Sequence, residues 1–182
     1  MLYESCDKRE DVVAAVLRRP YVRIPAIAFD VGCKGIYGEK NEYGFRNASG
    51  YKIELKSGRT LERLPSMDIC EVAWDALTLV LCENEKASYT VMNVFEDCPL
   101  FIEAETDSDT TVNIYENESL LSYIELKAGD NIRQEVGRLK HSDDCQITIE
   151  VIKGCIRLHA LCFGDVKESH YDGFLEMEIP QP

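Results

Sequence analysis

The stretch from residue 87 to residue 163 most constrains the fold of this 182-residue chain. It contains blocks in which apolar and polar residues nearly alternate and in which Val, Ile, Thr, Tyr and Phe are frequent. These blocks are residues 87–94, 99–104, 110–115, 120–126, 145–151 and 155–163. Polar turn sequences such as Glu116-Asn117-Glu118 and Lys153-Gly154 separate them. Short alternating strands at regular spacing predict an antiparallel sandwich or barrel.

The N-terminal region has a different pattern. Residues 5–19 predict an amphipathic helix, because Val12, Val13, Val16 and Leu17 fall on one stripe and Pro20 follows. We therefore expect an N-terminal helix or linker over residues 1–20 and a β-sandwich domain over residues 21–182. Further strands are expected at residues 21–29, 51–55, 59–64, 67–71, 74–82 and 174–179.

The charge excludes some classes of partner. The formal net charge is −13, from 20 basic and 33 acidic side chains. Nucleic acids and anionic membrane surfaces both select for clustered Lys and Arg, so neither is expected to bind. A run of apolar residues long enough for a membrane helix is also absent from the sequence.

The eight cysteines do not form a metal-binding or redox motif, because no two of them are separated by two residues. No signal peptide is visible at the N-terminus. The absence of a visible signal peptide predicts reduced thiols and a cytoplasmic location. The alternative is an extracellular location, if the chain is a fragment of a secreted enzyme.

Several motifs occur in a familiar order. They are Ala26-Ile27-Ala28-Phe29-Asp30, Gly35-Ile36-Tyr37, Arg63, Met67-Asp68-Ile69, Glu85 with Tyr89-Thr90-Val91, and the closing strand from Arg157 to Phe163. In this order the chain resembles the carbohydrate-binding modules of family 6. The resemblance implies an antiparallel jelly-roll β-sandwich, which is all-β apart from the short N-terminal helix.

The resemblance also implies ligand positions. The family's structural calcium uses a Glu in the opening segment and an Asp in the closing strand, where this chain has Ile27 and His159. Calcium needs oxygen ligands, so we expect the calcium to be lost and no metal or cofactor to be present. In the family's sugar cleft, Tyr37 matches one of two clasping aromatic residues, and Arg157 stands where the family has an Asn.

The loop from Tyr37 to Tyr51 has the residue types that a sugar site needs, because aromatic faces stack on sugar rings and planar polar groups bind hydroxyls. The residues predicted to bind sugar are Tyr37, Glu39, Asn41, Tyr43 and Arg157. The alternative is that the loop aromatics cover one end of the sandwich.

For several other residues the sequence predicts structural roles. Trp74 begins an apolar strand and is expected in the core, and Glu85 is expected to hold the turn before Tyr89. Tyr115 and Tyr123 flank a turn, and either face a partner domain or cap a sheet edge. A solvated loop is favoured over a metal site for Asp165, His170 and Asp172 in the tail.

No motif for a nucleophile, a phosphate loop or a catalytic metal is present, and no pair of carboxylates is singled out. We therefore expect no catalytic residues. The predicted function is a non-catalytic carbohydrate-binding module of a glycoside hydrolase, which binds an oligosaccharide or polysaccharide by aromatic stacking. The alternative is an accessory interaction or spacer domain that has lost sugar binding and packs on a glycosidase catalytic domain.

Overall fold

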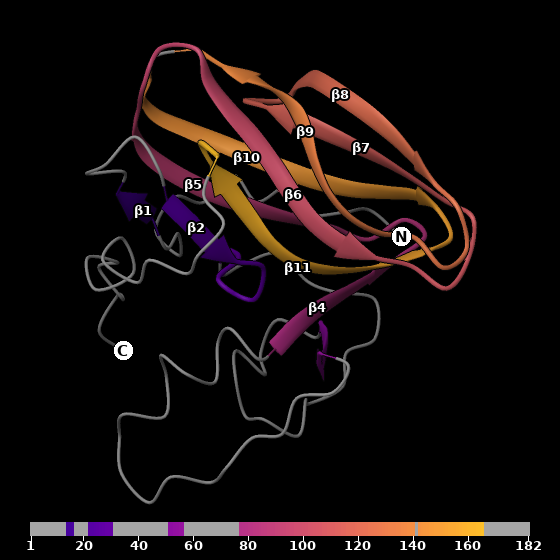
Figure 1. Ribbon diagram of the computed structural model, residues 1–182. Helices are drawn as coiled ribbons and strands as arrows, with labels where there is room; N and C mark the ends of the chain where they lie inside the picture. Colours follow the sequence, from indigo (N-terminus) through magenta and orange to yellow (C-terminus); the bar gives the residue numbers. More distant parts are fainter. Residues whose placement is uncertain (1–13, 17–21, 31–50, 57–76, 141, 166–182) are drawn as a thin grey trace, which may run out of the picture.

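The computed structural model describes residues 14–16, 22–30, 51–56, 77–140 and 142–165 (Figure 1). These residues form strands and connecting turns. The strands are β1 (Ala14–Val16), β2 (Val22–Pro25), β3 (Lys52–Leu55), β4 (Leu77–Cys82), β5 (Lys86–Val94), β6 (Cys98–Glu105), β7 (Thr110–Glu116), β8 (Ser119–Leu126), β9 (Asn131–Leu139), β10 (Ser142–Lys153) and β11 (Cys155–Phe163). Among the described residues, no helix is long and apolar enough to cross a membrane.

The strands form two sheets that pack face to face (Figure 1). The first sheet has the order β1-β5-β10-β7-β8, and the second has the order β3-β4-β11-β6-β9. Strand β2 pairs with residues 160–163 of β11, beyond the part of β11 that pairs with β4. All the pairs are antiparallel except β1 with β5. The predicted antiparallel jelly-roll β-sandwich is therefore confirmed.

The core lies between the sheets and follows the alternation of the sequence. In β6, Leu100, Ile102 and Ala104 are fully buried, and in β10 the odd-numbered residues from 145 to 151 are fully buried. Alternate residues point to the same face of a strand, so each strand contributes one apolar row to the core. Burial of apolar surface is the main source of stability in such a sandwich.

The predicted N-terminal helix falls mostly outside the described residues. The three residues of it that are described, Ala14–Val16, form strand β1 and not a helix. They pair with residues 90–92 of β5. The edge of β5 offers unpaired backbone groups, and this tertiary pairing overrides a local helical pattern at a β-branched residue such as Val16.

The segment after β2 connects the two sheets. Residues 26–30 are buried, and the Ala26 N–H donates to the His159 carbonyl of the second sheet at 2.9 Å. At the other end, the Asp30 N–H donates to the Ser88 carbonyl of the first sheet at 2.7 Å. The Tyr89 hydroxyl donates to the Ala26 carbonyl at 2.6 Å. The opening motif of the family resemblance thus closes one side of the sandwich.

The structural role predicted for Glu85 is confirmed. Its side chain is fully buried, and Oε2 accepts a hydrogen bond from the Cys82 N–H at 2.8 Å. The Glu85 N–H in turn donates to the Cys82 carbonyl at 2.8 Å. Together these bonds fix the turn between β4 and β5. Trp74 lies outside the described residues, so its predicted core role stays a prediction.

Candidate functional site

Four of the five predicted sugar-binding residues, Tyr37, Glu39, Asn41 and Tyr43, lie outside the described residues, so a cleft in that loop stays a prediction. Tyr51, at the end of the loop, is described. It is 1% exposed, its ring lies edge-on to Phe29 with 4.7 Å between ring centroids, and its hydroxyl donates to the Lys86 carbonyl. Tyr51 therefore covers the core, as the alternative reading of the loop aromatics expected.

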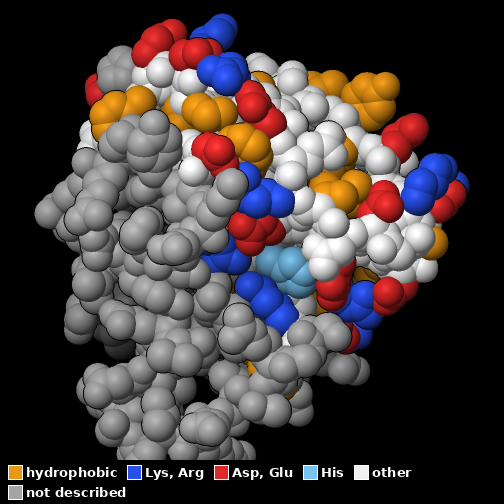
Figure 2. Space-filling view, viewed as in Figure 1, with side chains coloured by type: hydrophobic (Ala, Val, Ile, Leu, Met, Phe, Trp, Pro, Cys, Tyr) orange, Lys and Arg blue, Asp and Glu red, His pale blue; other side chains and the backbone are white. Residues whose placement is uncertain are grey.

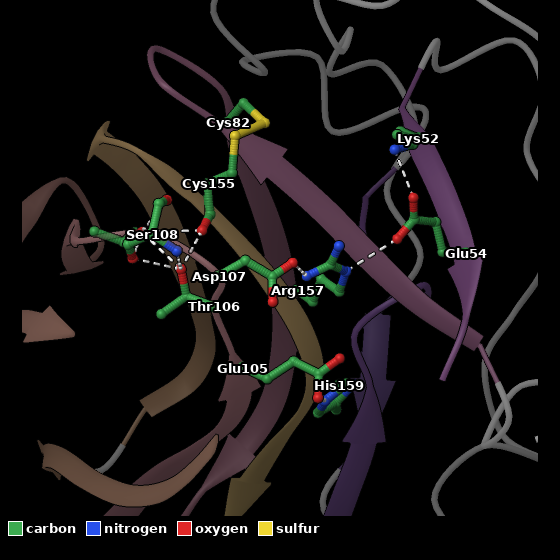
Figure 3. Close-up of polar contacts among 11 residues, drawn as sticks. Lys52, Glu54, Cys82, Glu105, Thr106, Asp107, Ser108, Cys155, Arg157 and His159 are labelled. Atoms are coloured by element: carbon green, nitrogen blue, oxygen red, sulfur yellow. Dashed lines mark hydrogen bonds and ion pairs between the residues drawn. A yellow bond between two sulfur atoms is a disulfide. The ribbon is translucent and has the colours of Figure 1, made fainter. Parts of the chain in front are cut away.

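Arg157, the fifth predicted residue, lies on the outer face of the second sheet, between two carboxylates (Figure 3). Its Nε donates to Glu54 Oε2 of β3 at 3.0 Å, and its Nη1 pairs with Asp107 in the turn after β6. Lys52 pairs with the other oxygen of Glu54 at 2.5 Å. The hydrogen bonds that Arg157 donates to Asp107 and Glu54 raise its pKa. The guanidinium is thus fixed within an ion-pair network.

Burial would raise the pKa of Glu54, but the hydrogen bonds from Lys52 and Arg157 outweigh it and leave the pKa lowered. The carboxylate is therefore charged at neutral pH. A sugar hydroxyl at this position would have to compete with the charged partners of Arg157. The predicted sugar contact of Arg157 stays a prediction.

The two positions that correspond to the family's calcium ligands have different environments. Ile27 is fully buried in the core. His159 is on the outer face of β11, where its Nε2 lies 3.7 Å from Glu105 Oε2 and its side chain is 11% exposed. Burial lowers the pKa of His159, and the charge of Lys56 lowers it further. The loss of the family's calcium stays a prediction.

The outer face of the second sheet is densely charged. Besides Arg157, it carries Arg23, whose Nη2 lies 2.7 Å from Glu103 Oε2, and Arg133, whose guanidinium lies 4.6 Å from the centroid of the Phe101 ring. Figure 2 shows blue and red side chains next to one another around the pale-blue histidine on this face. Such a network of paired charges holds strands together and offers little apolar surface for a sugar ring.

A disulfide joins the strands beside Arg157. Cys82 and Cys155, opposite one another in β4 and β11, form a disulfide (Figure 3). The prediction of reduced thiols is therefore wrong for these two residues, because strand register brings residues 73 positions apart into direct contact. The prediction agrees with the free thiols of Cys98, Cys145 and Cys162, which are buried. The other three cysteines lie outside the described residues.

The outer face of the first sheet has a different character. We call Asn113, Tyr115, Tyr123 and Glu150 the tyrosine face. In the strand register, Tyr123 of β8 lies opposite Asn113 of β7, which lies opposite Glu150 of β10. Directly paired residues point to the same side of a sheet. The three side chains therefore form a row across β8, β7 and β10.

Tyr115 links this row together. Its hydroxyl accepts a hydrogen bond from Asn113 Nδ2 at 3.0 Å and donates one to Glu150 Oε2 at 2.8 Å. Partial burial raises the pKa of Tyr115; the bond from Asn113 lowers it, and Glu150 raises it again, so that the net shift is upward. The phenol therefore stays protonated at neutral pH and remains a donor to Glu150.

Tyr123 is the most exposed of the large hydrophobic side chains that the structure describes, at 64%, and Leu120 on the same strand follows at 57%. Among the described residues, no hydrogen bond uses Asn113 Oδ1 or Glu150 Oε1. The tyrosine face thus presents an open aromatic ring beside an amide oxygen and a carboxylate oxygen. Sequence reasoning singled out Tyr115 and Tyr123, but it left the amide and the carboxylate unnoticed. Alternation of polar residues along β7 and β10 was the signal available for them.

Comparison with known proteins shows which structures have a similar fold. No protein-family model and no curated protein matches the sequence. A family 6 carbohydrate-binding module from Clostridium stercorarium, solved in complex with cellobiose, matches with a TM-score of 0.53 and 10% identity, over 85% of this chain and 98% of that one. The C-terminal family 6 module of LamC, a marine laminarinase from Zobellia galactanivorans, matches with a TM-score of 0.51 and 11% identity, over 80% of this chain and 99% of that one. At these identities the likeness concerns the fold alone, and the chain has the jelly-roll β-sandwich fold of family 6 carbohydrate-binding modules.

Proposed function

We propose that the chain is a non-catalytic carbohydrate-binding module and that the tyrosine face binds the sugar. The observation that carries this proposal is the open ring of Tyr123 beside the hydrogen-bonded group of Asn113, Tyr115 and Glu150. Aromatic faces stack on the C–H surface of sugar rings, and planar polar groups bind the hydroxyls. The shared fold with known modules supports the same function.

The hydrogen bonds of the face give each residue a role. Tyr123 supplies the stacking surface. Asn113 Oδ1 and Glu150 Oε1 accept hydrogen bonds from sugar hydroxyls, while Tyr115 holds the two side chains in place through their other atoms. Because this network exists before the ligand arrives, little side-chain entropy is lost when the sugar binds. The loop from Tyr37 to Tyr43 is a second candidate for the same function.

Calorimetric titration with neutral gluco-, xylo- and manno-oligosaccharides tests the proposal. Binding of at least one of them is expected, and Tyr123→Ala should weaken it by at least about tenfold, since loss of one stacked ring removes on the order of 1.5 kcal/mol. Leu120→Ala is the matched control, because Leu120 is similarly exposed on the same strand but offers no ring. It should leave sugar affinity unchanged.

Two outcomes would contradict the proposal, the first its function and the second its site. If no oligosaccharide binds at millimolar concentration, the sugar-binding function is wrong. If Tyr37→Ala abolishes binding while Tyr123→Ala has no effect, the function holds but the tyrosine face is not its site.

The second candidate function is an accessory domain that packs on a glycosidase catalytic domain. The observation that favours it is the exposure of Leu120 together with Tyr123 on strand β8. Two large exposed side chains on one strand are suited to a protein contact. In that case Leu120→Ala and Tyr123→Ala would both weaken association with the catalytic domain, and the wild type would bind no oligosaccharide.

We also propose that the sandwich holds no structural calcium at the position used by the family. The support is the chemistry of Ile27, which is buried and supplies no oxygen ligand. Chelation with EDTA should leave the Tm unchanged. A fall in Tm that added calcium reverses would show that the chain has a calcium site elsewhere or retains this one.

A further inference from the structure

The turn between β7 and β8 carries a modification motif. Its sequence, Asn117-Glu118-Ser119, fits the N-glycosylation pattern Asn-x-Ser/Thr, with Glu at the middle position where Pro is excluded. All three residues are exposed. Asn117 and Glu118 form the two-residue tip of the hairpin with φ angles of +47° and +68°. Asn is one of the few residues that adopts this left-handed conformation readily.

The side chain of Asn117 is oriented so that the reactive atom points away from existing contacts. Its Oδ1 accepts a hydrogen bond from the Gln146 N–H at 2.8 Å, and its own N–H donates to the Gln146 carbonyl at 2.9 Å. Among the described residues, Nδ2 of Asn117 has no hydrogen-bond partner. A glycan is attached through Nδ2, so the bond that anchors the side chain to β10 can remain after modification.

The disulfide is an independent observation that points to the same cellular environment. Disulfides such as Cys82–Cys155 form and persist in the oxidising secretory pathway and are rare in the cytosol. N-glycans are added in the lumen of the same pathway. The disulfide therefore favours the extracellular alternative for the location of this chain.

We propose that Asn117 is an N-glycosylation site. In the reaction, Nδ2 attacks the anomeric carbon of an oligosaccharide carried on a lipid diphosphate. A bond forms between Nδ2 and that carbon, the bond from the carbon to the phosphate oxygen breaks, and the lipid diphosphate leaves with the electron pair. The amide nitrogen loses one proton, which passes to the released lipid diphosphate or to water. The Ser119 hydroxyl is the motif element that the transferase recognises.

The position of Asn117 has two consequences. In strand β7, Asn113 is four residues before the tip, which places the attached glycan roughly 13 Å from the row of Tyr123. The glycan is therefore attached away from this row, whereas Tyr115 is only two residues from the attachment point. The glycan also stands at the end of β8, an edge strand among the described residues, where a bulky hydrophilic group hinders edge-to-edge pairing with another chain.

The test is to secrete the full chain from yeast or insect cells behind a cleavable signal peptide. Tryptic peptides are then analysed by mass spectrometry after peptide N-glycosidase treatment in ¹⁸O-labelled water, which converts a glycosylated Asn to labelled Asp. We expect the label at Asn117. Peptide mapping distinguishes a label at Asn117 from a label at the second motif in the sequence, Asn47-Ala48-Ser49.

Two variants of Ser119 provide a matched pair, since Ser119 is exposed and both changes leave Asn117 in place. Ser119→Ala should abolish the glycan at Asn117, and Ser119→Thr should retain it. The proposal is overturned if the wild-type chain is secreted with an unlabelled Asn117 peptide. It is also overturned if the Ser119→Ala chain carries as much glycan at Asn117 as the wild type. The labelling result on the wild type stands even if one variant fails to be secreted.

Discussion

Gly154 shows how one residue fixes the end of the sandwich where the disulfide lies. It forms the turn between β10 and β11 with a φ of +80°. A Cβ atom at this position would lie 2.6 Å from the Asp109 carbonyl oxygen and 2.6 Å from Thr110 Oγ1. The next residue, Cys155, has a carbonyl that accepts hydrogen bonds from the hydroxyls of Thr106 and Thr110 at 2.7 and 2.9 Å. The turn is therefore packed tightly against the loop after β6.

This packing predicts a difference between two glycines. Gly129 also has a positive φ, of +90°, but a Cβ added there would meet nothing within 4 Å. Gly129→Ala should lower the free energy of unfolding by about 1 kcal/mol, through backbone strain alone. Gly154→Ala should lower it by about 3 kcal/mol or more, because a clash with backbone atoms is added. Urea denaturation of both variants measures the difference, and equal losses would contradict the packing argument.

The ion pairs of Arg157 make a prediction about pH. The pKa of Glu54 is lowered in the folded state, so the charged carboxylate favours folding above its unfolded pKa of about 4.3. That contribution is lost as the pH falls through the folded pKa. Arg157→Gln should reduce stability at pH 7 by on the order of 1 kcal/mol or less, because both side chains are about one-third exposed. The deficit should shrink in acid, below about pH 4.

Arg138→Gln is the control for this prediction. Arg138 pairs with Asp97 at 2.7 Å, but it is 53% exposed. Solvent screens such a pair, so its removal should have no measurable effect on the pH dependence of Tm. A deficit for Arg157→Gln that stays constant from pH 7 to strongly acidic pH would mean that Arg157 contributes packing and not charge.

At the scale of the strands, the sequence predicted most elements. Alternation marked β5, β6, β7, β8, β10 and β11 with small errors at their ends. It missed β9, where only Val136 and Leu139 are buried and Gly137 interrupts the pattern. Strand β9 is the edge of its sheet among the described residues. An edge strand buries few side chains, so its existence depends on pairing with β6, which the local sequence does not encode.

The cross-strand disulfide predicts how β4 and β11 respond to reduction. It closes a loop of 73 residues, and the loss of unfolded-state entropy for such a loop amounts to about 4 kcal/mol. Reduction with dithiothreitol should therefore lower the Tm of the wild type. The Cys82→Ser/Cys155→Ser double variant should have the lower Tm even without dithiothreitol, and dithiothreitol should not change it. An unchanged Tm, with reduction verified by mass spectrometry, would contradict a stabilising role.

For the whole molecule, the sequence predicted the fold better than the site. The order of motifs along the chain was sufficient for the sandwich, because alternation and turns are local properties. The tyrosine face depends on register between distant strands: Glu150 lies opposite Asn113 only because β10 pairs with β7. A shift of one residue would turn Glu150 to the other face. Local sequence therefore indicated Tyr115 and Tyr123 but not the polar groups beside them.

The overall charge predicts which glycans the tyrosine face accepts. With a net charge of −13, the chain repels anionic ligands, and Glu150 places a carboxylate at the face itself. A neutral oligosaccharide is repelled neither by the net charge nor by the carboxylate of Glu150. Its affinity should therefore be the same at low and high salt. An oligosaccharide of uronic acids should bind more weakly at low salt. It should gain affinity as the screening length falls from about 30 Å at 0.01 M to about 10 Å at 0.1 M salt.

Isothermal titration at these two salt concentrations, with a neutral and a uronic oligosaccharide of equal length, measures both effects. Asn113→Asp sharpens the test, because it adds one negative charge beside Glu150 with little change in shape. This variant should weaken binding of the uronic ligand more than binding of the neutral ligand, and more so at low salt. If the uronic ligand binds more tightly than the neutral one at low salt, the binding site must contain cations. Either Lys86, which lies opposite Glu150 in the strand register, or the charged network around Arg157 would then supply them.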